Sequence, residues 1–281
     1  MKSNKIKSFA KVNLCLNVTG KTQLLHKIET VVAFVDLYDE ISIESINSKK
    51  HKILFIGKFS KNIYKNNTIS KLLQILEKKK LLKDKKFKIL INKKIPHQSG
   101  LGGGSMNAAN ILLFLVKKKI IKTSKKELLY IANKVGSDVK LGLNSTYSIL
   151  TSKNKISHFR NCKRIHTLII KPDFGCSTKY VFSKVERFNK PKLNNPNKNM
   201  FSLNFLKKME NVLEPIVFSK YPKLRLIKAY LENLPKINFV RMTGSGSAIV
   251  AYFQSKESCI ITKKKIMKKY KNCWCMVSKT I

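Results

Sequence analysis

A dense run of glycines between two apolar segments is the feature that most constrains how this chain can fold. The stretch Ile95–Val116, IPHQSGLGGGSMNAANILLFLV, has four glycines within five residues. The β-branched segment Phe87–Ile91 before it predicts a strand, and the segment from Asn107 to about Lys118 predicts a helix, with its start near Ser105. Such a turn directs unpaired backbone N–H groups at one point, which suits a phosphate. An ordinary glycine-rich turn has the same composition, so both interpretations stand at this stage.

The glycine loop matches neither of the two best-known nucleotide motifs. The P-loop pattern GxxxxGK[ST] needs a lysine after its last glycine, whereas Gly104 is followed by Ser105 and Met106. The dinucleotide pattern GxGxxG also fails, because its third glycine position falls on Ser105 or Asn107. The case for a phosphate site therefore depends on the order of strand, turn and helix.

Hydrophobic patterning along the rest of the chain predicts a mixed α+β protein. Further strands are expected at 7–18, 31–35, 40–46, 52–56, 146–150, 167–171, 239–242, 248–253 and 273–277. Further helices are expected at 69–79, 203–212, 224–233 and 256–268, and the polar segment 187–200 is expected to be a loop. Another helix should open at Ser124, with Glu127 completing a capping box, and stop at Gly136.

A boundary near Lys153 would divide the chain into two α+β halves, an N-terminal lobe of residues 1–153 and a C-terminal lobe of residues 154–281. At 281 residues and 43% hydrophobic content, the chain is long and apolar enough for substantial cores. The cleft between two such lobes is the natural place for a ligand.

The net charge of +43 raises the question of a polyanionic partner. Nearly all of the positive charge is lysine, because the chain has only five arginines: Arg160, Arg164, Arg187, Arg225 and Arg241. Recognition of bases and phosphates through paired hydrogen bonds favours arginine. We therefore prefer a compositional bias, as expected for an AT-rich genome, to a surface selected for nucleic acid. The charge would still steer an anionic small molecule inward.

Cysteine usage and hydropathy predict a cytoplasmic protein. Six cysteines without a CxxC pair indicate reduced thiols and give no metal-ligand spacing. The opening MKSNKIKSFAKVNL lacks a continuous apolar core and a small-residue cleavage site, so no secretory signal is expected. The longest apolar run, Ile111–Val116, is far shorter than the roughly 20 residues that cross a bilayer. We expect no membrane partner, and a monomer or homodimer.

Three further segments carry residues that could form a site. FAKVNLCLNVTGK places Lys11 and Asn13 on one face of a strand, since side chains recur there at every second residue. RMTGSGSAIVAYF makes a second glycine turn, Gly244–Gly246, between two expected strands. In VGSDVKLGL, Asp138 follows the expected helix end at Gly136. An aspartate there is often a cap or turn residue, and one lysine among many is often a surface charge.

In this order and at these distances, the motifs resemble those of the GHMP kinases, the superfamily of galactokinase, homoserine kinase and mevalonate kinase. The resemblance spans almost the whole chain in seven collinear segments: FAKVNLCLNVTGK, HKIETVVAFVDLYDEISIE, INKKIPHQSGLGGGSMNAANIL, VGSDVKLGL, PDFGCSTKYVF, MENVLEPIVFSKYP and VRMTGSGSAIVAYF. It implies a two-lobed GHMP kinase fold with the active site in the cleft between the lobes. Within the superfamily, the match is closest to the branch that uses ATP to phosphorylate the 2-hydroxyl of a cytidyl diphosphate sugar alcohol, on the non-mevalonate route to isoprenoid precursors.

The resemblance also implies roles for individual residues. The ATP phosphates would be wrapped by Pro96, His97, Gln98, Ser99, Gly100, Leu101, Gly102, Gly103, Gly104, Ser105 and Met106, with Asn67 near the adenine. Asp138 would be the catalytic base and Lys11 its partner. His26 would contact the cytosine, and further substrate contacts are implied for Asn13, Thr178, Gly244, Ser245 and Gly246. Mg²⁺ would accompany ATP, held by phosphate oxygens and water, because the sequence shows no dedicated carboxylate cluster.

The chemistry of these residue types agrees with that division of roles. Phosphoryl transfer needs positioning, charge stabilisation and one group that accepts the proton of the attacking hydroxyl. A carboxylate such as Asp138 can accept that proton, and a nearby ammonium keeps the carboxylate ionised and stabilises the forming alkoxide.

The chain departs from the family pattern at the expected cytosine site and in the segment that follows Asp138. Leu24 and Leu25 replace the Gly-Tyr that precedes the histidine, so an aromatic neighbour worth about 1–3 kcal/mol in base stacking is lost. A lone histidine such as His26 is otherwise more often structural than a ligand. Lys140 stands where proline is common. These changes predict slower catalysis rather than loss of activity.

The glycine loop departs from the family as well. His97, Gln98 and Ser99 replace residues that are mostly glycine, which is tolerable where the contacts come from the backbone and φ stays negative. Met106 replaces a usual serine, at a cost of at most one hydrogen bond, roughly 1 kcal/mol.

Two rival functions stay open at this stage. The first is a kinase of the same superfamily that acts on homoserine or another small alcohol. The second is a basic nucleic-acid-binding protein, which would bind DNA or RNA with a steep salt dependence.

Overall fold

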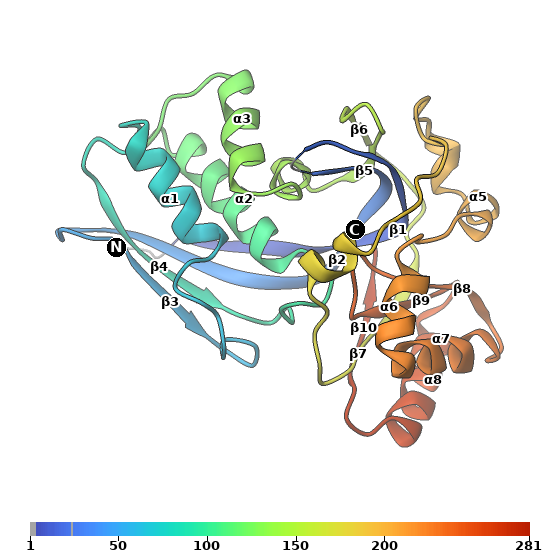
Figure 1. Cartoon of the computed structure of the whole chain (residues 1–281). Coiled ribbons are helices and arrows are strands. Elements are labelled where there is room, and N and C mark those ends of the chain that lie inside the picture. The colour runs from blue at the N-terminus through green and yellow to red at the C-terminus, as the bar shows by residue number, and fades with distance from the viewer. Residues whose placement is uncertain (1–3, 24) are drawn as a thin grey trace. The chain divides into compact units, whose positions relative to one another are not determined.

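The computed structural model describes residues 4–23 and 25–281 and confirms the mixed α+β class (Figure 1). The strands are β1 (Asn4–Lys21), β2 (His26–Ile46), β3 (Lys52–Ile56), β4 (Lys86–Asn92), β5 (Tyr147–Leu150), β6 (Ile156–Phe159), β7 (His166–Lys171), β8 (Ile237–Met242), β9 (Ile249–Phe253) and β10 (Trp274–Lys279). The α-helices are α1 (Thr68–Lys78), α2 (Gly103–Lys117), α3 (Lys125–Val135), α4 (Thr178–Ser183), α5 (Leu203–Lys208), α6 (Glu214–Lys220), α7 (Pro222–Glu232) and α8 (Lys256–Lys269). Two short 3-10 helices are η1 (Val139–Leu143) and η2 (Lys198–Phe201).

The chain forms two compact units that alternate along the sequence. Unit 1 comprises the N-terminal segment up to Ala10, Leu37–His97 and Gly102–Ser145, and unit 2 comprises Lys11–Asp36, Gln98–Leu101 and Thr146–Ile281. Membership changes inside β1 and inside β2, so each of these strands serves both units. No local sequence signal marks such a change within a continuous strand. The single boundary near Lys153 stays a prediction.

Unit 1 is a layer of helices on one face of a sheet. Strand β4 lies between β3, to which it is parallel, and the C-terminal part of β2, to which it is antiparallel. Alternate residues of the strands face the helices, because successive side chains of a strand point to opposite faces. Helices α1, α2 and α3 cover that face (Figure 1).

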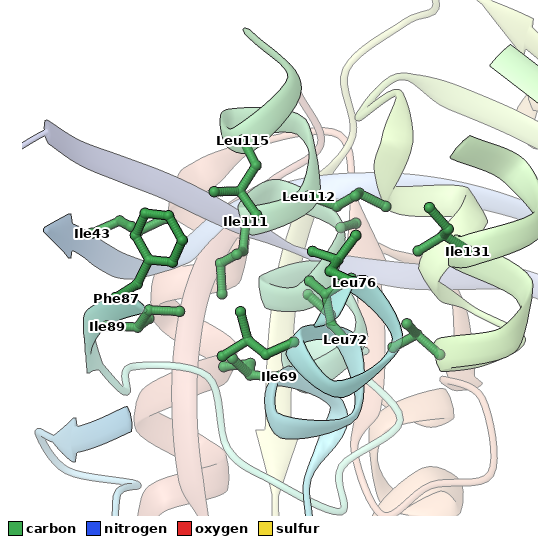
Figure 2. Packing of buried hydrophobic residues seen from close by; sticks show 14 of the residues in the cluster. Ile43, Ile69, Leu72, Leu76, Phe87, Ile89, Ile111, Leu112, Leu115 and Ile131 are labelled. Carbon is green, nitrogen blue, oxygen red and sulfur yellow. The ribbon is translucent and has the colours of Figure 1, made fainter. Parts of the chain in front are cut away.

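The core of unit 1 forms where the three helices meet the sheet. Helix α1 buries Ile69, Leu72, Leu73 and Leu76, which are spaced as one face of a helix. Figure 2 shows Leu72 and Leu76 of α1 lying among Ile111 and Leu112 of α2 and Ile131 of α3. Each such buried side chain contributes about 1.5–3 kcal/mol, so this apolar cluster holds the glycine loop's flanking strand and helix in place.

Unit 2 contains an antiparallel sheet in the order β10-β7-β9-β8. Every residue of β9, IVAYF, is buried, which is typical of a strand covered on both faces. In the same unit the N-terminal part of β2 pairs with β5, and β5 pairs with β6. Apolar residues of α6, α7 and α8 share a buried cluster with β7, β8 and β9.

Strand β2 is one continuous strand, whereas the patterning predicts two, at 31–35 and 40–46. The interruption that suggested two strands comes from Asp36 and Asp39. Tertiary hydrogen bonds satisfy both carboxylates: Asp36 accepts from Ser278 and Lys279, and Asp39 from the residues described below. Since the polar groups are paired, the strand continues through them.

Several element boundaries also differ from the prediction. Helix α2 begins at Gly103, earlier than the predicted start near Ser105, and α5 ends at Lys208 rather than at 212. The elements η1, β6, α4, η2 and α6 were not predicted, because segments of four to seven residues carry too little periodicity. Of these, η2 begins within the segment 187–200, which was predicted to be a loop. By contrast, α3 has Ser124 and Gly136 as its caps, as predicted. The predicted capping box is not completed, because the Glu127 carboxylate accepts from Lys79 and Thr123 instead.

Within residues 4–23 and 25–281, no helix combines the length and apolar character that a membrane span requires.

Candidate functional site

The exit of the glycine loop leads directly into helix α2 of unit 1. Gly102 is the N-cap residue in the left-handed region, with φ of 71°, and no side chain caps the helix there. Glycine is needed at this position because other residues rarely adopt that backbone. The first turn of α2 therefore keeps N–H groups that no cap side chain accepts, together with the positive end of the helix dipole. Such an end can bind a phosphate.

Close packing surrounds the first turn of α2. A Cβ on Gly103 would lie 3.0 Å from Ile95 Cγ2 and 3.3 Å from Lys93 Nζ, and one on Gly104 would lie 3.1 Å from Thr68 Oγ1. The two glycines thus let α2 approach the end of β4 and the start of α1.

The middle of the loop, Gln98–Leu101, belongs to unit 2 and is held there by backbone hydrogen bonds. The carbonyl of Gln98 accepts from the N–H groups of Cys176 and Ser247, and the carbonyl of Ser99 accepts from Ala248. Gly100 has φ of 76°, and a Cβ there would lie 1.9 Å from the carbonyl oxygen of Thr243. Only glycine fits this contact.

Gln98 overturns one expectation about the loop. The replacement of glycine at 97–99 was expected to be tolerable if φ stayed negative, but Gln98 has φ of 50°. This is the left-handed region, which costs a non-glycine residue roughly 1–2 kcal/mol. The hydrogen bonds to the Gln98 carbonyl hold the residue in that conformation.

Met106 is fully buried and packs toward the 3-10 helix η1. A Cβ on Gly142 would lie 3.0 Å from Met106 Sδ and 2.7 Å from Ala109 Cβ. The side chain at 106 therefore fills space between α2 and η1, which explains why an apolar residue is accommodated where the family usually has serine.

Lys11 and Asn13 lie on β1 in unit 2 and contact each other, as their shared strand face predicts. Both are buried, and Lys11 Nζ donates to Asn13 Oδ1 at 2.5 Å. Asn13 N–H donates to Thr243 Oγ1 at 3.0 Å, and Thr243 Oγ1 donates to the Gly100 carbonyl at 3.2 Å. Lys11 is thus a buried cation in a polar network, which excludes the interpretation of an ordinary surface charge. Thr243 connects two of the predicted motifs. The sequence analysis missed it, because the Asn13 N–H that its hydroxyl accepts from is 230 residues away in the chain.

The second glycine turn lies within the same network. Gly244 has φ of 56°, and its carbonyl accepts from Asn211 Nδ2 at 2.8 Å. Ser245 Oγ forms a 2.8 Å hydrogen bond with Thr178 Oγ1, so these two predicted substrate residues meet. Gly246 also has a positive φ, of 79°. Unit 2 therefore brings Lys11, Asn13, Gly100, Thr178 and the turn together.

His26 lies at the start of β2 in an aromatic cluster of unit 2. Its ring centroid is 5.3 Å from that of Phe182 and 6.3 Å from that of Phe188. Burial, and then the charge of Lys21, lowers the pKa of His26, so the imidazole is neutral at pH 7. Leu25 is 62% exposed, and Leu24 lies outside the described residues. The two phenylalanines come from segments far along the chain, which no local signal links to His26.

Asp138 directly precedes η1 in unit 1. It occupies the N-cap position, yet its side chain makes no cap hydrogen bond, so Asp138 is a turn residue rather than a side-chain cap. Lys140 is buried in the same short helix, and burial lowers its pKa while the charge of Asp138 acts to raise it. The two side chains therefore interact electrostatically at the start of η1.

Asn67 is the N-cap of α1. Its Oδ1 accepts from the N–H groups of Ile69 and Ser70, and its Nδ2 donates to the carbonyls of Tyr64 and Lys65. The amide thus has a structural role in unit 1. The next residue, Thr68, donates from Oγ1 to the Gly104 carbonyl at 2.9 Å, so the start of α1 lies beside the exit of the glycine loop.

A buried ion pair between Asp39 and Lys93, at the entry of the loop, was missed by the sequence analysis. Strand parity could have found it, because Leu37, Ile41 and Ile43 are buried at alternate positions of β2 and Asp39 falls in the same series.

Residues 4–23 and 25–281 contain a groove away from the predicted site and no cluster of metal-ligand side chains. A groove of about 690 Å³ in unit 2 contains none of the predicted site residues; it is lined by Cys162, Lys163, Arg164, Ile165, Lys198, Asn199, Phe201, Ser202, Leu203, Asn204, Phe253 and Gln254. No group of three or more His, Cys, Asp or Glu side chains in those ranges could hold a metal ion.

Comparison with known proteins identifies the family and the fold. Residues 67–150 match the model of the GHMP kinases N terminal domain. A 4-diphosphocytidyl-2-C-methyl-D-erythritol kinase from Pelagibacter ubique is 53% identical over 281 residues, covering 100% of both chains. A crystal structure of 4-(cytidine 5'-diphospho)-2C-methyl-D-erythritol kinase has the same fold, with a TM-score of 0.75 and 22% identity over 99% of this chain and 100% of that one. Homoserine kinase from Cytophaga hutchinsonii gives a TM-score of 0.70 and 17% identity over 100% of this chain and 96% of the other.

Proposed function

The chain belongs to the family of 4-diphosphocytidyl-2-C-methyl-D-erythritol kinases, and we propose that it transfers a phosphate from ATP to the 2-hydroxyl of that cytidyl compound. The relative of 53% identity over the full length of both chains carries this assignment. The sequence resemblance and the family of the relative agree on this substrate. Homoserine kinase shares the fold, but homoserine is the weaker candidate for the substrate of this chain.

The proposed phosphate site is the glycine loop from Pro96 to Met106. The left-handed Gly102 at an N-terminus without a side-chain cap is the observation that supports it most directly. Asn67 is proposed near the adenine because the start of α1 is hydrogen-bonded to the loop exit through Thr68. Since the Asn67 amide is fully engaged in the cap, a direct contact with adenine would exchange one of those hydrogen bonds.

The proposed cytosine site is centred on His26. Its neutral imidazole has a buried Nε2 with no hydrogen-bond partner among the described residues, and this nitrogen can pair with a base edge. Phe182 and Phe188 flank it, and Phe188 is 46% exposed, so aromatic surface is present although position 25 is leucine. We propose Asn13, Thr178, Gly244, Ser245 and Gly246 as the further substrate contacts.

For the reaction, we propose that Asp138 accepts the proton of the attacking hydroxyl and that Lys11 stabilises the charge that develops on its oxygen. Two observations support these roles: the Asp138 carboxylate does not cap η1, and Lys11 is a buried cation held by Asn13. The proton passes from the hydroxyl to the carboxylate as the oxygen attacks the transferred phosphate, and ADP leaves.

Mg²⁺ is proposed to arrive with ATP and to supply charge neutralisation on the phosphates. We propose that phosphate oxygens and water hold the ion. A cytoplasmic location is also proposed, since the six cysteines of the chain are unpaired in the structure. The monomeric or homodimeric state stays a prediction.

The proposal is tested by measuring ADP release from ATP alone, with the cytidyl substrate and with homoserine. We expect turnover with the cytidyl substrate; transfer to homoserine alone would contradict the assignment. Asp138→Asn and Lys11→Ala should each abolish turnover while circular dichroism shows a folded protein. Lys7→Ala, an exposed lysine on the same strand, is the matched control and should keep activity. Turnover at the wild-type rate in both site variants would refute their roles.

The nucleic-acid rival makes the opposite prediction. It requires tight DNA or RNA binding that weakens steeply with salt and survives Asp138→Ala. Such binding without any cytidyl-dependent ADP release would favour the rival.

A further inference from the structure

Asp39 is a single buried carboxylate that accepts four hydrogen bonds. It is 0% exposed and faces the helix layer of unit 1, in the inward series of β2. Oδ1 accepts from the backbone N–H groups of Lys94 and Ile95, both at 2.8 Å. Oδ2 accepts from Lys93 Nζ and, at 2.9 Å, from Asn107 Nδ2. Charge-assisted hydrogen bonds of this kind are stronger than neutral ones.

These partners lie on the two sides of the glycine loop. Lys93, Lys94 and Ile95 form the entry, after β4, whereas Asn107 lies one turn into α2, beyond the exit. Lys93 Nζ is 3.3 Å from the place where a Cβ on Gly103 would stand, so the ion pair lies directly under the first turn of the helix. One carboxylate thus links the entry of the loop to its exit.

We propose that Asp39 is a positioning residue for nucleotide binding, which sets the spacing and orientation of the loop entry relative to the first turn of α2. This inference rests on the proposed function, since it takes the glycine loop as the phosphate site. Asp39 touches neither ATP nor the acceptor; it acts through the backbone that it holds. Backbone N–H groups bind a phosphate well only if their directions converge, so a small shift of entry against exit weakens the site.

A purely structural role would give a different result. If Asp39 only stabilised unit 1, its loss would lower the melting temperature and leave the affinity of the folded molecules for nucleotide unchanged. A positioning role requires weaker nucleotide binding by protein that is still folded.

Asp39→Asn is the first test. The asparagine side chain keeps the shape of aspartate and one carbonyl oxygen. Its NH₂ group cannot accept the hydrogen bonds that Lys93 Nζ and Asn107 Nδ2 donate to Asp39. The dissociation constant for the non-hydrolysable ATP analogue AMP-PNP is measured by calorimetry, at a temperature where circular dichroism shows the variant to be folded. We expect a rise of about tenfold or more, with the KM for the acceptor unchanged.

Asn107→Ala is the second test and covers the case in which Asp39→Asn does not fold. It removes one hydrogen bond and keeps the ion pair, so the rise in the AMP-PNP dissociation constant should have the same direction and be smaller. Glu77→Gln is the matched control, because it removes the same charge from a lysine ion pair in unit 1 between α1 and β4. It should leave AMP-PNP binding unchanged.

Unchanged AMP-PNP binding in folded Asp39→Asn or Asn107→Ala would overturn the proposal. An equal loss in Glu77→Gln would do so as well, since the effect would then come from charge alone. AMP-PNP binding is read without the acceptor, so a failure of the cytidyl assay would count against the proposed function and leave this result standing.

Discussion

Gln98 holds a backbone conformation at the centre of the glycine loop that glycine would adopt more easily. Its φ is 50°, and its carbonyl accepts hydrogen bonds from Cys176 and Ser247. The surrounding contacts, rather than the preference of the residue, decide this geometry. Gln98 is therefore a position at which this loop differs from the family pattern, in which glycine is usual.

We predict that Gln98→Gly stabilises the protein by about 0.5–1 kcal/mol. Relief of the left-handed conformation contributes roughly 1–2 kcal/mol, and the greater freedom of glycine in the unfolded chain offsets about 0.5–1 kcal/mol of it. The measurement is urea unfolding of both proteins, with the slopes compared to exclude a change in the unfolded state. A lower midpoint for Gln98→Gly would show that the side chain stabilises the loop.

Gly100→Ala makes the opposite change in the same loop, from glycine to a residue with a side chain. Its Cβ would stand 1.9 Å from the backbone carbonyl oxygen of Thr243, which cannot move aside as a flexible side chain could. We expect a loss of roughly 3 kcal/mol or more, or no folding.

At the element scale, the glycine loop is defined by the helix that it starts. Sequence patterning predicted a helix after the loop, but α2 begins at Gly103, so the last glycines belong to the helix itself. The start of α2 could not be predicted from the sequence, because glycine has poor helix propensity. Glycine is needed there because Ile95 and Thr68 pack closely against the first turn, and that packing exists only in the tertiary structure. Element types were predictable, and their ends were not.

The caps of α1 and α3 allow a test of Asn67. We predict that Asn67→Ala lowers the free energy of unfolding by about 1 kcal/mol and also raises the KM for ATP, because the start of α1 is hydrogen-bonded to the loop exit. Ser124→Ala removes the equivalent cap of α3 and is the control. It should cost about the same stability and leave the KM for ATP unchanged.

Chemical denaturation and steady-state kinetics measure the two quantities. An unchanged KM for ATP in Asn67→Ala would limit Asn67 to capping and remove it from the proposed adenine site.

At the scale of the whole molecule, the net charge of +43 sets the long-range electrostatics. Such a charge repels itself in the folded state and attracts anionic molecules, and added salt screens both effects. Five of the described basic side chains are buried and take part in specific interactions, so they stand apart from the general lysine excess: Lys11, Lys93, Lys140, Lys171 and Arg241.

We predict that the melting temperature rises by a few degrees between about 0.05 and 0.5 M KCl, while kcat/KM for ATP falls, because the Debye length shortens over this range. Differential scanning calorimetry and initial rates measure the two effects. Sucrose in place of KCl is the control for effects unrelated to charge. A melting temperature that falls with salt would show that attractive ion pairs outweigh the repulsion.

The amino-acid sequence by itself determined the α+β class, most of the strands and helices, and the positions of both glycine turns. These depend on periodicity and on glycine's backbone freedom, which act over a few residues. It also placed Lys11 and Asn13 on one strand face, and their hydrogen bond confirms that placement. The roles assigned to the site residues stay predictions.

The tertiary structure alone decided which distant groups meet. It joins Thr178 to Ser245, surrounds His26 with Phe182 and Phe188, and gives Asp39 its four donors across 54 to 68 residues of chain. It also makes β2 one strand, because the partly buried Asp36 and the buried Asp39 find partners only after folding. Hydrogen-bond partners far apart in the chain leave no local pattern, and their satisfaction is a property of the packed molecule.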